Sequence, residues 1–332
     1  MTPRIEIGVV GLGPAWIHRC GGCGFRQVRP RPRPDDLASL YGEDYFDPDA
    51  SAGFREYAAQ RQRYDREGYF LARTLGRLAG RGRLLEVGCG LGFLLNALAR
   101  ATDWEVEGVE LSAFGARYAR ERFGVTVHRG TLEAVRYPAD RFDFVIQKDL
   151  LEHVRNPRRH LEETRRVMRP GARLWLITPN GEADVRPLAN AAAALDADAL
   201  PVLDQGHLSF FTRPQLLRLA ADSGFRCVRL RAIGVRRGLR ALGYLPGGAR
   251  APVLTRRELA ATVRKREGGD GVSAADAYRT LAEVIDRETA RRHRRLRAWT
   301  PYYHYRRWMK GIDAVAASLT AGRDFEVVLE KV

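Results

Sequence analysis

The chain has 332 residues, a formal net charge of +16 and four cysteines. That length exceeds one ordinary domain, so we expect one sizeable α/β core with appended elements rather than two equal domains. The few scattered cysteines exclude a disulfide framework, the absence of an apolar run near 20 residues excludes a membrane span, and no secretory signal opens the chain, so we expect a cytoplasmic protein.

Residues 1–36 contain two patterns that imitate known motifs without completing them. Residues 7–13 look like a nucleotide-binding glycine turn, but no helix pattern follows, so we interpret the match as a decoy. Cys20, Cys23 and His18 offer at most three zinc ligands, whereas a structural site needs four. We therefore favour a degenerate, metal-free Cys-containing segment over bound zinc.

Residues 83–92 hold an apolar run that breaks into alternating glycines and then into a helical pattern. The run suits a strand that is buried on both faces. Gly88, Gly90 and Gly92 permit positive φ and let a ligand lie against bare backbone. Glu86 places a carboxylate where a pyrophosphate would be repelled, which suits an amine or a sulfonium instead.

Residues 104–110 form a second strand pattern, which ends in Glu110, 20 positions past Gly90. An acid at this point of a doubly wound sheet can accept both hydroxyls of a ribose. Alternatively, Glu110 caps the helix expected at residues 112–123. Because the two signals lie one βαβ unit apart, together they favour a nucleoside ligand.

The glycine run of residues 84–92 and the Gly-Val-Glu-Leu-Ser of residues 108–112 resemble the first two motifs of class I S-adenosylmethionine-dependent methyltransferases. The Leu-Glu-His-Val, Arg-Pro-Gly and Thr-Pro-Asn of residues 151–180 are similar to the ubiquinone-biosynthesis-type members. The resemblance implies a Rossmann-like α/β fold, with a seven-stranded, mostly parallel sheet, an antiparallel last strand from Asp324 and a helical insertion. It also implies S-adenosyl-L-methionine as the cofactor, and a degenerate zinc-binding-like segment at the N-terminus.

The same resemblance assigns the cofactor-binding positions. It places Glu86 near the methionine moiety, the glycine turn beneath it, and the loop after the third strand beside the adenine. Many relatives have an aspartate where Thr131 stands, which shifts the polar contact with the adenine amine to the backbone or to Glu133. The expected cofactor-binding residues are Glu86, Gly88, Cys89, Gly90, Gly92, Glu110, Leu111, Thr131, Leu132, Glu133 and Gln147.

Two histidines are candidates for a general base. His153 follows the fourth strand, at the carboxyl edge of the sheet where α/β folds bind ligands. His207 begins a helix over the same mouth in relatives. We place His153 ahead of His207 as the base, and an orienting or packing role is the alternative for each.

The positive charge is concentrated late in the chain. Residues 226–310 hold 22 Lys or Arg against 7 Asp or Glu, so the rest of the chain is close to neutral. The arginines of residues 291–297 could grip phosphates, and a solvated helical face is the alternative. We expect four segments, which are a Cys-containing segment 1–36, a core 37–232 with a lid at 181–205, a basic helical insertion 233–321 and a last core strand 322–332.

The predicted reaction is methyl transfer to an O, N or C nucleophile of a small-molecule acceptor, such as a natural product, sugar, quinone or lipid precursor. An anionic acceptor is within this expectation. Two alternatives remain, an RNA methyltransferase that uses the basic insertion and a non-catalytic protein that binds the donor. Nucleic acid is disfavoured because no RNA-binding module is recognisable beside the core, and the oligomeric state is left open.

Overall fold

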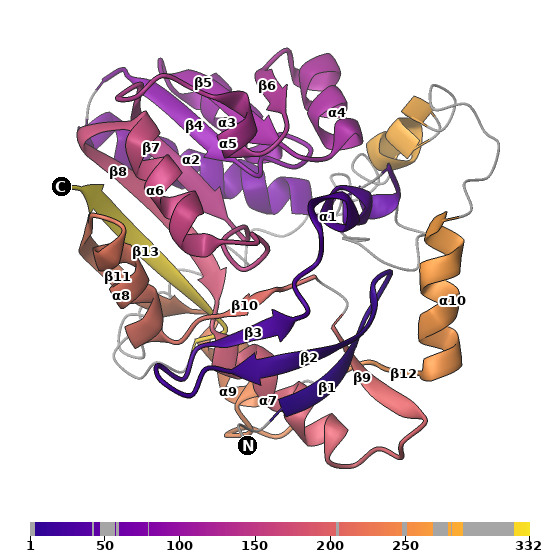
Figure 1. Cartoon of the computed structure of the whole chain (residues 1–332). Coiled ribbons are helices and arrows are strands. Elements are labelled where there is room, and N and C mark those ends of the chain that lie inside the picture. The colour runs from indigo at the N-terminus through magenta and orange to yellow at the C-terminus, as the bar shows by residue number, and fades with distance from the viewer. Residues whose placement is uncertain are drawn as a thin grey trace.

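The computed structural model describes residues 4–41, 43–46, 57, 60–78, 80–203, 206–247, 251–267, 278–279, 281–287 and 322–332. The arginine cluster at 291–297 therefore lies outside the described residues, as does most of the expected insertion beyond residue 267. The described chain forms two sheets with helices around them (Figure 1). None of the described helices has the length and hydrophobicity that crossing a membrane requires.

The larger sheet has seven strands in the order β11-β13-β8-β7-β4-β5-β6. Strands β8, β7, β4, β5 and β6 run parallel, while β13 is antiparallel to both of its neighbours. This arrangement confirms the expected Rossmann-like sheet and its antiparallel last strand. The bounds are β4 (Arg83–Val87), β5 (Glu105–Glu110), β6 (Thr126–Arg129), β7 (Phe142–Lys148), β8 (Met168–Pro179), β11 (Phe225–Ile233) and β13 (Asp324–Lys331).

Helices cover both faces of this sheet because its central strands are apolar on both sides. Leu84 and Leu85 are adjacent in β4, are both fully buried, and belong to different hydrophobic clusters. One cluster joins the sheet to α2 (Arg61–Leu78), α3 (Phe93–Ala101) and α4 (Ala113–Phe123). The other joins it to α5 (Leu132–Val135), α6 (Pro157–Val167) and α8 (Arg213–Asp222). Successive side chains of a strand point to opposite faces, which explains the two clusters.

The smaller sheet collects segments from distant parts of the chain, in the order β10-β3-β2-β1-β9-β12. Its apolar face packs with α7 (Gly181–Ala192) in a third cluster that includes Ile7, Ile17, Val185 and Leu188. The strands are β1 (Arg4–Val9), β2 (Gly13–Arg19), β3 (Arg26–Arg29), β9 (Ala199–Leu203), β10 (Ser209–Phe210) and β12 (Val253–Thr255). The remaining elements are α1 (Pro34–Leu40), η1 (Glu43–Phe46), α9 (Val235–Ala241) and α10 (Arg256–Glu267).

This smaller sheet joins segments that the sequence analysis kept apart. Residues 7–13 form an antiparallel hairpin, with Val9 paired to Gly13, so the interpretation as a decoy is confirmed. The segment 181–205, expected as a lid, contributes α7 and β9, and β9 pairs with both β1 and β12. Leu188 of α7 and Leu203 of β9 are buried in the third cluster, which accounts for the apolar composition of this segment. The strands of the smaller sheet come from three of the expected segments, with β1, β2 and β3 from 1–36, β9 and β10 from 37–232 and β12 from 233–321.

Close packing between α2 and α3 gives a stability prediction. A Cβ added to Gly68 would lie 2.5 Å from the Cβ of Ala97, whereas a Cβ added to Gly76 of the same helix would meet nothing within 4 Å. We expect Gly68→Ala to lower the free energy of unfolding by ~1–3 kcal/mol through overpacking. Gly76→Ala, the matched control, should raise it by ~0.5–1 kcal/mol because alanine favours the helix. Urea unfolding measures both, and equal stability of the two variants would contradict the packing.

Candidate cofactor and catalytic site

The glycine turn between β4 and α3 is built from three residues with positive φ. Gly88, Gly90 and Gly92 have φ of 74°, 55° and 73°. A Cβ on Gly90 would lie 2.3 Å from the Tyr57 hydroxyl oxygen, and a Cβ on Gly92 would lie 2.7 Å from the Cβ of Ala119. Both the backbone conformation and the available space therefore require glycine here. Gly92 is the N-cap of α3, so the turn presents a helix N-terminus.

Glu110 connects this turn to the second strand. Its carboxylate accepts hydrogen bonds from the backbone N–H of Gly90 at 2.8 Å and of Ser112 at 2.7 Å. The side-chain cap of α4 is Ser112, which accepts from Gly115, so capping is not the role of the Glu110 side chain. Burial raises the pKa of Glu110, and the two backbone N–H groups oppose that rise. Each oxygen keeps a second lone pair that can accept from a ribose hydroxyl.

Glu86 is a buried carboxylate with an unused oxygen. It is 3 % exposed, and its Oε2 has no hydrogen-bond partner in the described part of the chain. Burial raises its pKa to about 8, although the charge of Lys148 opposes this rise. An orphaned buried carboxylate is costly unless a cation joins it. The α-amino group of S-adenosylmethionine is such a cation, so the residues of the turn fit this cofactor.

Aromatic side chains lie over the turn. The ring of Tyr57 is 5.1 Å from that of Phe46 and 5.6 Å from that of Phe93, and Tyr64 stacks on Tyr57 at 5.5 Å. The ammonium of Lys148 lies 4.1 Å from the Tyr64 ring centroid. The sequence analysis did not connect Phe46 with the site, because Tyr45 and Phe46 lie outside the strand and glycine signals.

Two other aromatic side chains of α2 point to solvent. Tyr69 and Phe70 of α2 are 55 % and 38 % exposed. The buried stripe of α2 is instead Tyr64, Gly68, Leu71 and Leu75, which follows the helical period. A wall over the cofactor turn therefore includes Tyr64 but neither Tyr69 nor Phe70.

The expected adenine loop is placed after β6, and its side chains are largely engaged. Thr131 caps α5 by accepting from the N–H of Ala134, and Leu132 is buried in the core. Glu133 lies 3.3 Å from Nδ1 of His160. Burial opposes ionisation of Glu133, but the bond to His160 lowers its pKa to about 2. Glu133 is therefore an anion whose orientation is set by His160, a residue that sequence reasoning did not single out.

Three other expected cofactor-binding residues have side chains that are buried, half-buried or already hydrogen-bonded. The amide of Gln147 donates to Thr164 at 2.7 Å, so the Gln147 side chain is fixed against α6. The Cys89 thiol is buried, close to Gly108 in β5. Leu111 is half-buried between Glu110 and the Ser112 cap. Cofactor contacts of Cys89 and Gln147 are therefore expected from their backbone, and they remain predictions.

His153 and His207 lie side by side, with ring centroids 4.9 Å apart. Nδ1 of His207 lies 2.9 Å from a carboxylate oxygen of Asp184, which also forms an ion pair with Arg323. Burial would lower the pKa of His207, but the charge and hydrogen bond of Asp184 raise it. His207 therefore keeps its proton to a higher pH than an ordinary histidine. Asp184 and Arg323 carry no signal in the sequence, because one lies in the expected lid and the other just before the last strand.

His153 has the opposite electrostatic environment. Burial, followed by the charge of His207, lowers its pKa to about 3. Its Nδ1 is buried without a hydrogen-bond partner among the residues described. His153 is therefore neutral at neutral pH, and its Nδ1 is available to accept a hydrogen bond, whereas Asp184 favours the charged form of His207. The structure brings the two candidates together and shifts their pKa values in opposite directions.

Glu152 completes this cluster. Its Oε2 accepts from the Thr178 hydroxyl at 2.9 Å, while burial raises its pKa to about 8 against the effect of His207. Glu152, His153 and His207 offer donor atoms that lie within 4.8 Å of one another, and such a group can hold a divalent cation. Protonation of His207 by the field of Asp184 competes with metal binding, since the ligating form of histidine is neutral.

Comparison with known proteins is decisive for the family. Residues 57–230 match the sequence profile of a family described as a methyltransferase domain. The chain belongs to this family. It is an S-adenosylmethionine-dependent methyltransferase, as the buried Glu86 and the glycine turn are suited to that donor. No curated protein matches the chain in sequence.

Solved structures share the fold at low identity. An S-adenosylmethionine-dependent methyltransferase from Mesorhizobium loti is 14% identical, covers 79% of this chain and 96% of its own, and has a TM-score of 0.44. Geranyl diphosphate C-methyltransferase from Streptomyces coelicolor A3(2) is 16% identical, with coverage of 86% and 83% and a TM-score of 0.43. That structure was solved with Mg²⁺, geranyl diphosphate and S-adenosyl-L-homocysteine.

The position of Glu110 predicts a direct effect on donor affinity. We expect Glu110→Ala to weaken S-adenosylmethionine binding by ~1.5–3 kcal/mol, since charge-assisted hydrogen bonds to the ribose are lost. Isothermal titration calorimetry measures this change. The matched control is Glu105→Ala in the same strand, whose side chain is 71 % exposed and pairs with Arg83. Equal donor affinity of the wild type and Glu110→Ala would contradict the assignment.

Glu86 predicts how stability depends on pH. Because its pKa in the folded chain is about 8, the folded state binds this proton more tightly than the unfolded chain between about pH 4.5 and pH 8. The stability of the unliganded protein should fall as pH rises through that window, with a share from Glu86 on the order of a few kcal/mol.

Thermal unfolding at pH 5 and pH 8 tests this share. Glu86→Gln should flatten the fall and be more stable than the wild type at pH 8, yet bind the donor more weakly. Glu162→Gln, which removes an exposed carboxylate of α6, is the control and should leave the fall unchanged. An unchanged pH dependence in Glu86→Gln would show that the buried carboxyl group does not titrate in this window.

Proposed function

We propose that this methyltransferase transfers the methyl group to an O, N or C nucleophile of a small-molecule acceptor. The observation that carries the proposal is the pair of His153 and His207 at the carboxyl edge of the sheet, in which the pKa of His153 is lowered to about 3 and that of His207 is raised. The Nδ1 of His153 has no hydrogen-bond partner among the described residues, so it would be able to accept a hydrogen bond from a small nucleophile. The proposal includes membership of the ubiquinone-biosynthesis-type subfamily, which the motifs of residues 151–180 resemble.

The donor supplies an already activated methyl group on a sulfonium, so the protein's main task is to position the reactants in line. Gly88, Gly90 and Gly92 would lie against the donor, Glu110 would accept from its ribose and Glu86 would neutralise its amino group. These roles bind and orient the donor without any covalent step on the protein.

His153 is assigned to the acceptor. When an acceptor must lose a proton, the free Nδ1 of His153 would accept a hydrogen bond from it and then the proton. His207 would position the acceptor as a hydrogen-bond donor, and Asp184 would keep His207 charged. Because the charge of His207 depresses the pKa of His153, an anionic acceptor in this position would raise the proton affinity of His153.

We expect His153→Asn to lower kcat by roughly 10²-fold or more for an acceptor that must be deprotonated. The measurement is transfer of labelled methyl from S-adenosylmethionine to a panel of phenols, amines and sugars. His128→Asn is the matched control, since His128 lies on β6 with a half-exposed ring. Loss of less than a few-fold in His153→Asn, with donor binding intact, would assign His153 a packing role.

Asp184→Asn tests the charge relation between the two histidines. Without the Asp184 carboxylate, His207 should be neutral and the pKa of His153 should rise, because the opposing charge is gone. The acidic limb of the kcat/KM profile should then move to higher pH. An unmoved limb would mean that His153 is not the group whose deprotonation controls the rate.

A further inference from the structure

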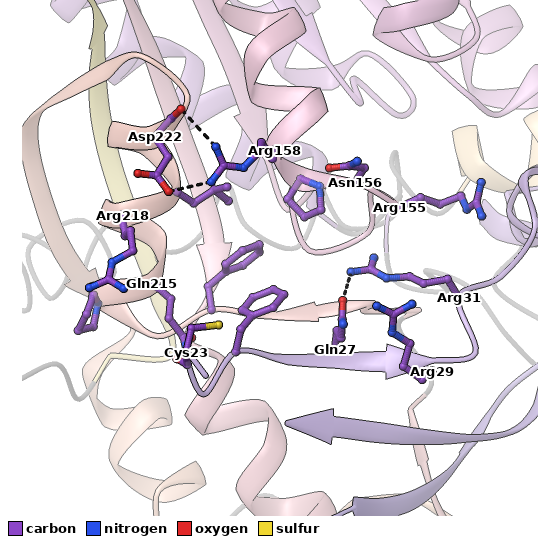
Figure 2. Close-up of a pocket in the computed structure, with 15 residues that line it drawn as sticks. Cys23, Gln27, Arg29, Arg31, Arg155, Asn156, Arg158, Gln215, Arg218 and Asp222 are labelled. Atoms are coloured by element: carbon purple, nitrogen blue, oxygen red, sulfur yellow. Dashed lines mark hydrogen bonds and ion pairs between the residues drawn. The ribbon is translucent and has the colours of Figure 1, made fainter. Parts of the chain in front are cut away.

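A cavity lies between β3, the N-terminal turn of α6 and α8 (Figure 2). Its volume is about 550 Å³, within the range of small-molecule sites. The charged side chains that line it are five arginines and one carboxylate, namely Arg29, Arg31, Arg155, Arg158, Arg218 and Asp222. The cavity therefore carries a marked excess of positive charge.

The single carboxylate is already used. Asp222 pairs with Arg158 at 2.7 Å. Within the described ranges, none of the other four arginines forms an ion pair with a carboxylate. Figure 2 shows the Asp222–Arg158 pair at one end of the cavity, while Arg29, Arg31 and Arg155 gather at the other end. The uncompensated charge is thus concentrated at that second end.

Arg31 shows most directly that these charges converge. Among the described residues, its guanidinium donates to neutral acceptors, which are Gln27 at 2.8 Å, Ser209 at 3.3 Å and the carbonyl of Val154 at 3.3 Å. Burial, followed by the charges of Arg29 and Arg155, lowers its pKa to about 10. Like charges that interact in this way without a counter-charge are unfavourable. An anion between them would remove this repulsion.

One wall of the cavity is apolar. The rings of Phe25 and Phe211 lie 5.4 Å apart, and both line the cavity together with Pro157, Pro214 and Leu219. A site with an apolar wall and a cationic end suits an organic molecule that bears an anionic group. Arginine forks match the oxygens of phosphate in a bidentate manner.

The cationic end adjoins the candidate base. Arg155 follows His153 by two residues, and Arg31 donates to the carbonyl of Val154, the residue between them. The loop from β7 to α6 thus presents His153 toward His207 and Arg155 toward the cavity. The described residues that line the cavity include neither His153 nor His207, so the backbone at Val154 is what joins the cationic end to the histidines.

We propose that Arg29, Arg31 and Arg155 bind a phosphate group of a small organic ligand in this cavity, and that the ligand is the methyl acceptor. The second half of this inference rests on the proposed function, whereas the anion site does not. The three arginines that would hold the phosphate come from β3, from the residues directly after it and from the loop between β7 and α6. Arg158 is not among them, because it stays paired with Asp222. The acceptor class is then a phosphorylated metabolite.

Inorganic pyrophosphate is the probe for the site, titrated into the full chain by calorimetry at two salt concentrations. We expect Arg31→Gln and Arg155→Gln each to weaken its binding at least about tenfold, because a charge-assisted bond to phosphate is lost. Arg100→Gln is the matched control, since it removes the same charge from the exposed last turn of α3. Its affinity for pyrophosphate should equal that of the wild type.

The outcomes separate the two halves of the proposal. No binding of pyrophosphate by the wild type, or equal weakening in Arg100→Gln, would overturn the anion site. S-adenosylhomocysteine binding should be the same in Arg31→Gln and in the wild type, so a failure of donor binding in all forms would count against the proposed function and not against this site. Tight RNA binding that pyrophosphate cannot displace would overturn the small-molecule assignment. Inhibition of methyl transfer by pyrophosphate in the wild type, but not in Arg31→Gln, would support the link to the acceptor.

Discussion

The site depends on one buried carboxylate that binds backbone from two different motifs. Glu110 ends β5 and accepts from Gly90 in the turn after β4 and from Ser112 at the start of α4. Those bonds fix the glycine turn against β5, so the turn and the carboxyl end of β5 keep a constant relation. A shift in the pairing of β4 with β5 would break this relation, and the five paired residues of that ladder resist such a shift.

Buried charges of both signs surround this anchor, and their balance is incomplete. Glu86 and Glu152 are acids whose pKa burial raises, while Lys148 and His207 are cations that partly offset them. A fold that keeps unpaired buried carboxylates gives up stability at neutral pH. In an enzyme whose substrate is a cation, the same groups become binding energy once the substrate arrives. The stability cost of these buried carboxylates and their attraction for a cation thus have a single physical origin.

The sequence was sufficient for the large sheet and insufficient for the small one. Strand, turn and helix signals between residues 83 and 178 are local, because apolar periodicity and glycine positions depend only on neighbouring residues. The antiparallel strand from Asp324 came from the resemblance alone. β9 and β12 are short, and their partners lie far away in the sequence, so no local pattern distinguishes them from a lid or a loop. Asp184 and Arg323 were missed for the same reason, since they meet His207 only through the tertiary fold.

The parallel pairing of β1 with β9 also bears on how the chain folds. Gly8 and Val9 pair with Val202 and Leu203, so β1 needs a partner that is made about 190 residues later. During that interval the N-terminal hairpin has an open edge and an uncovered apolar side, with Ile7 and Ile17 waiting for α7. Contacts of such long sequence separation form slowly, because the entropy of closing a large loop is lost before the contacts contribute any stabilising free energy. The smaller sheet therefore cannot be completed until β9 and β12 have been made, and until then the unpaired edge of β1 is open to association with other chains.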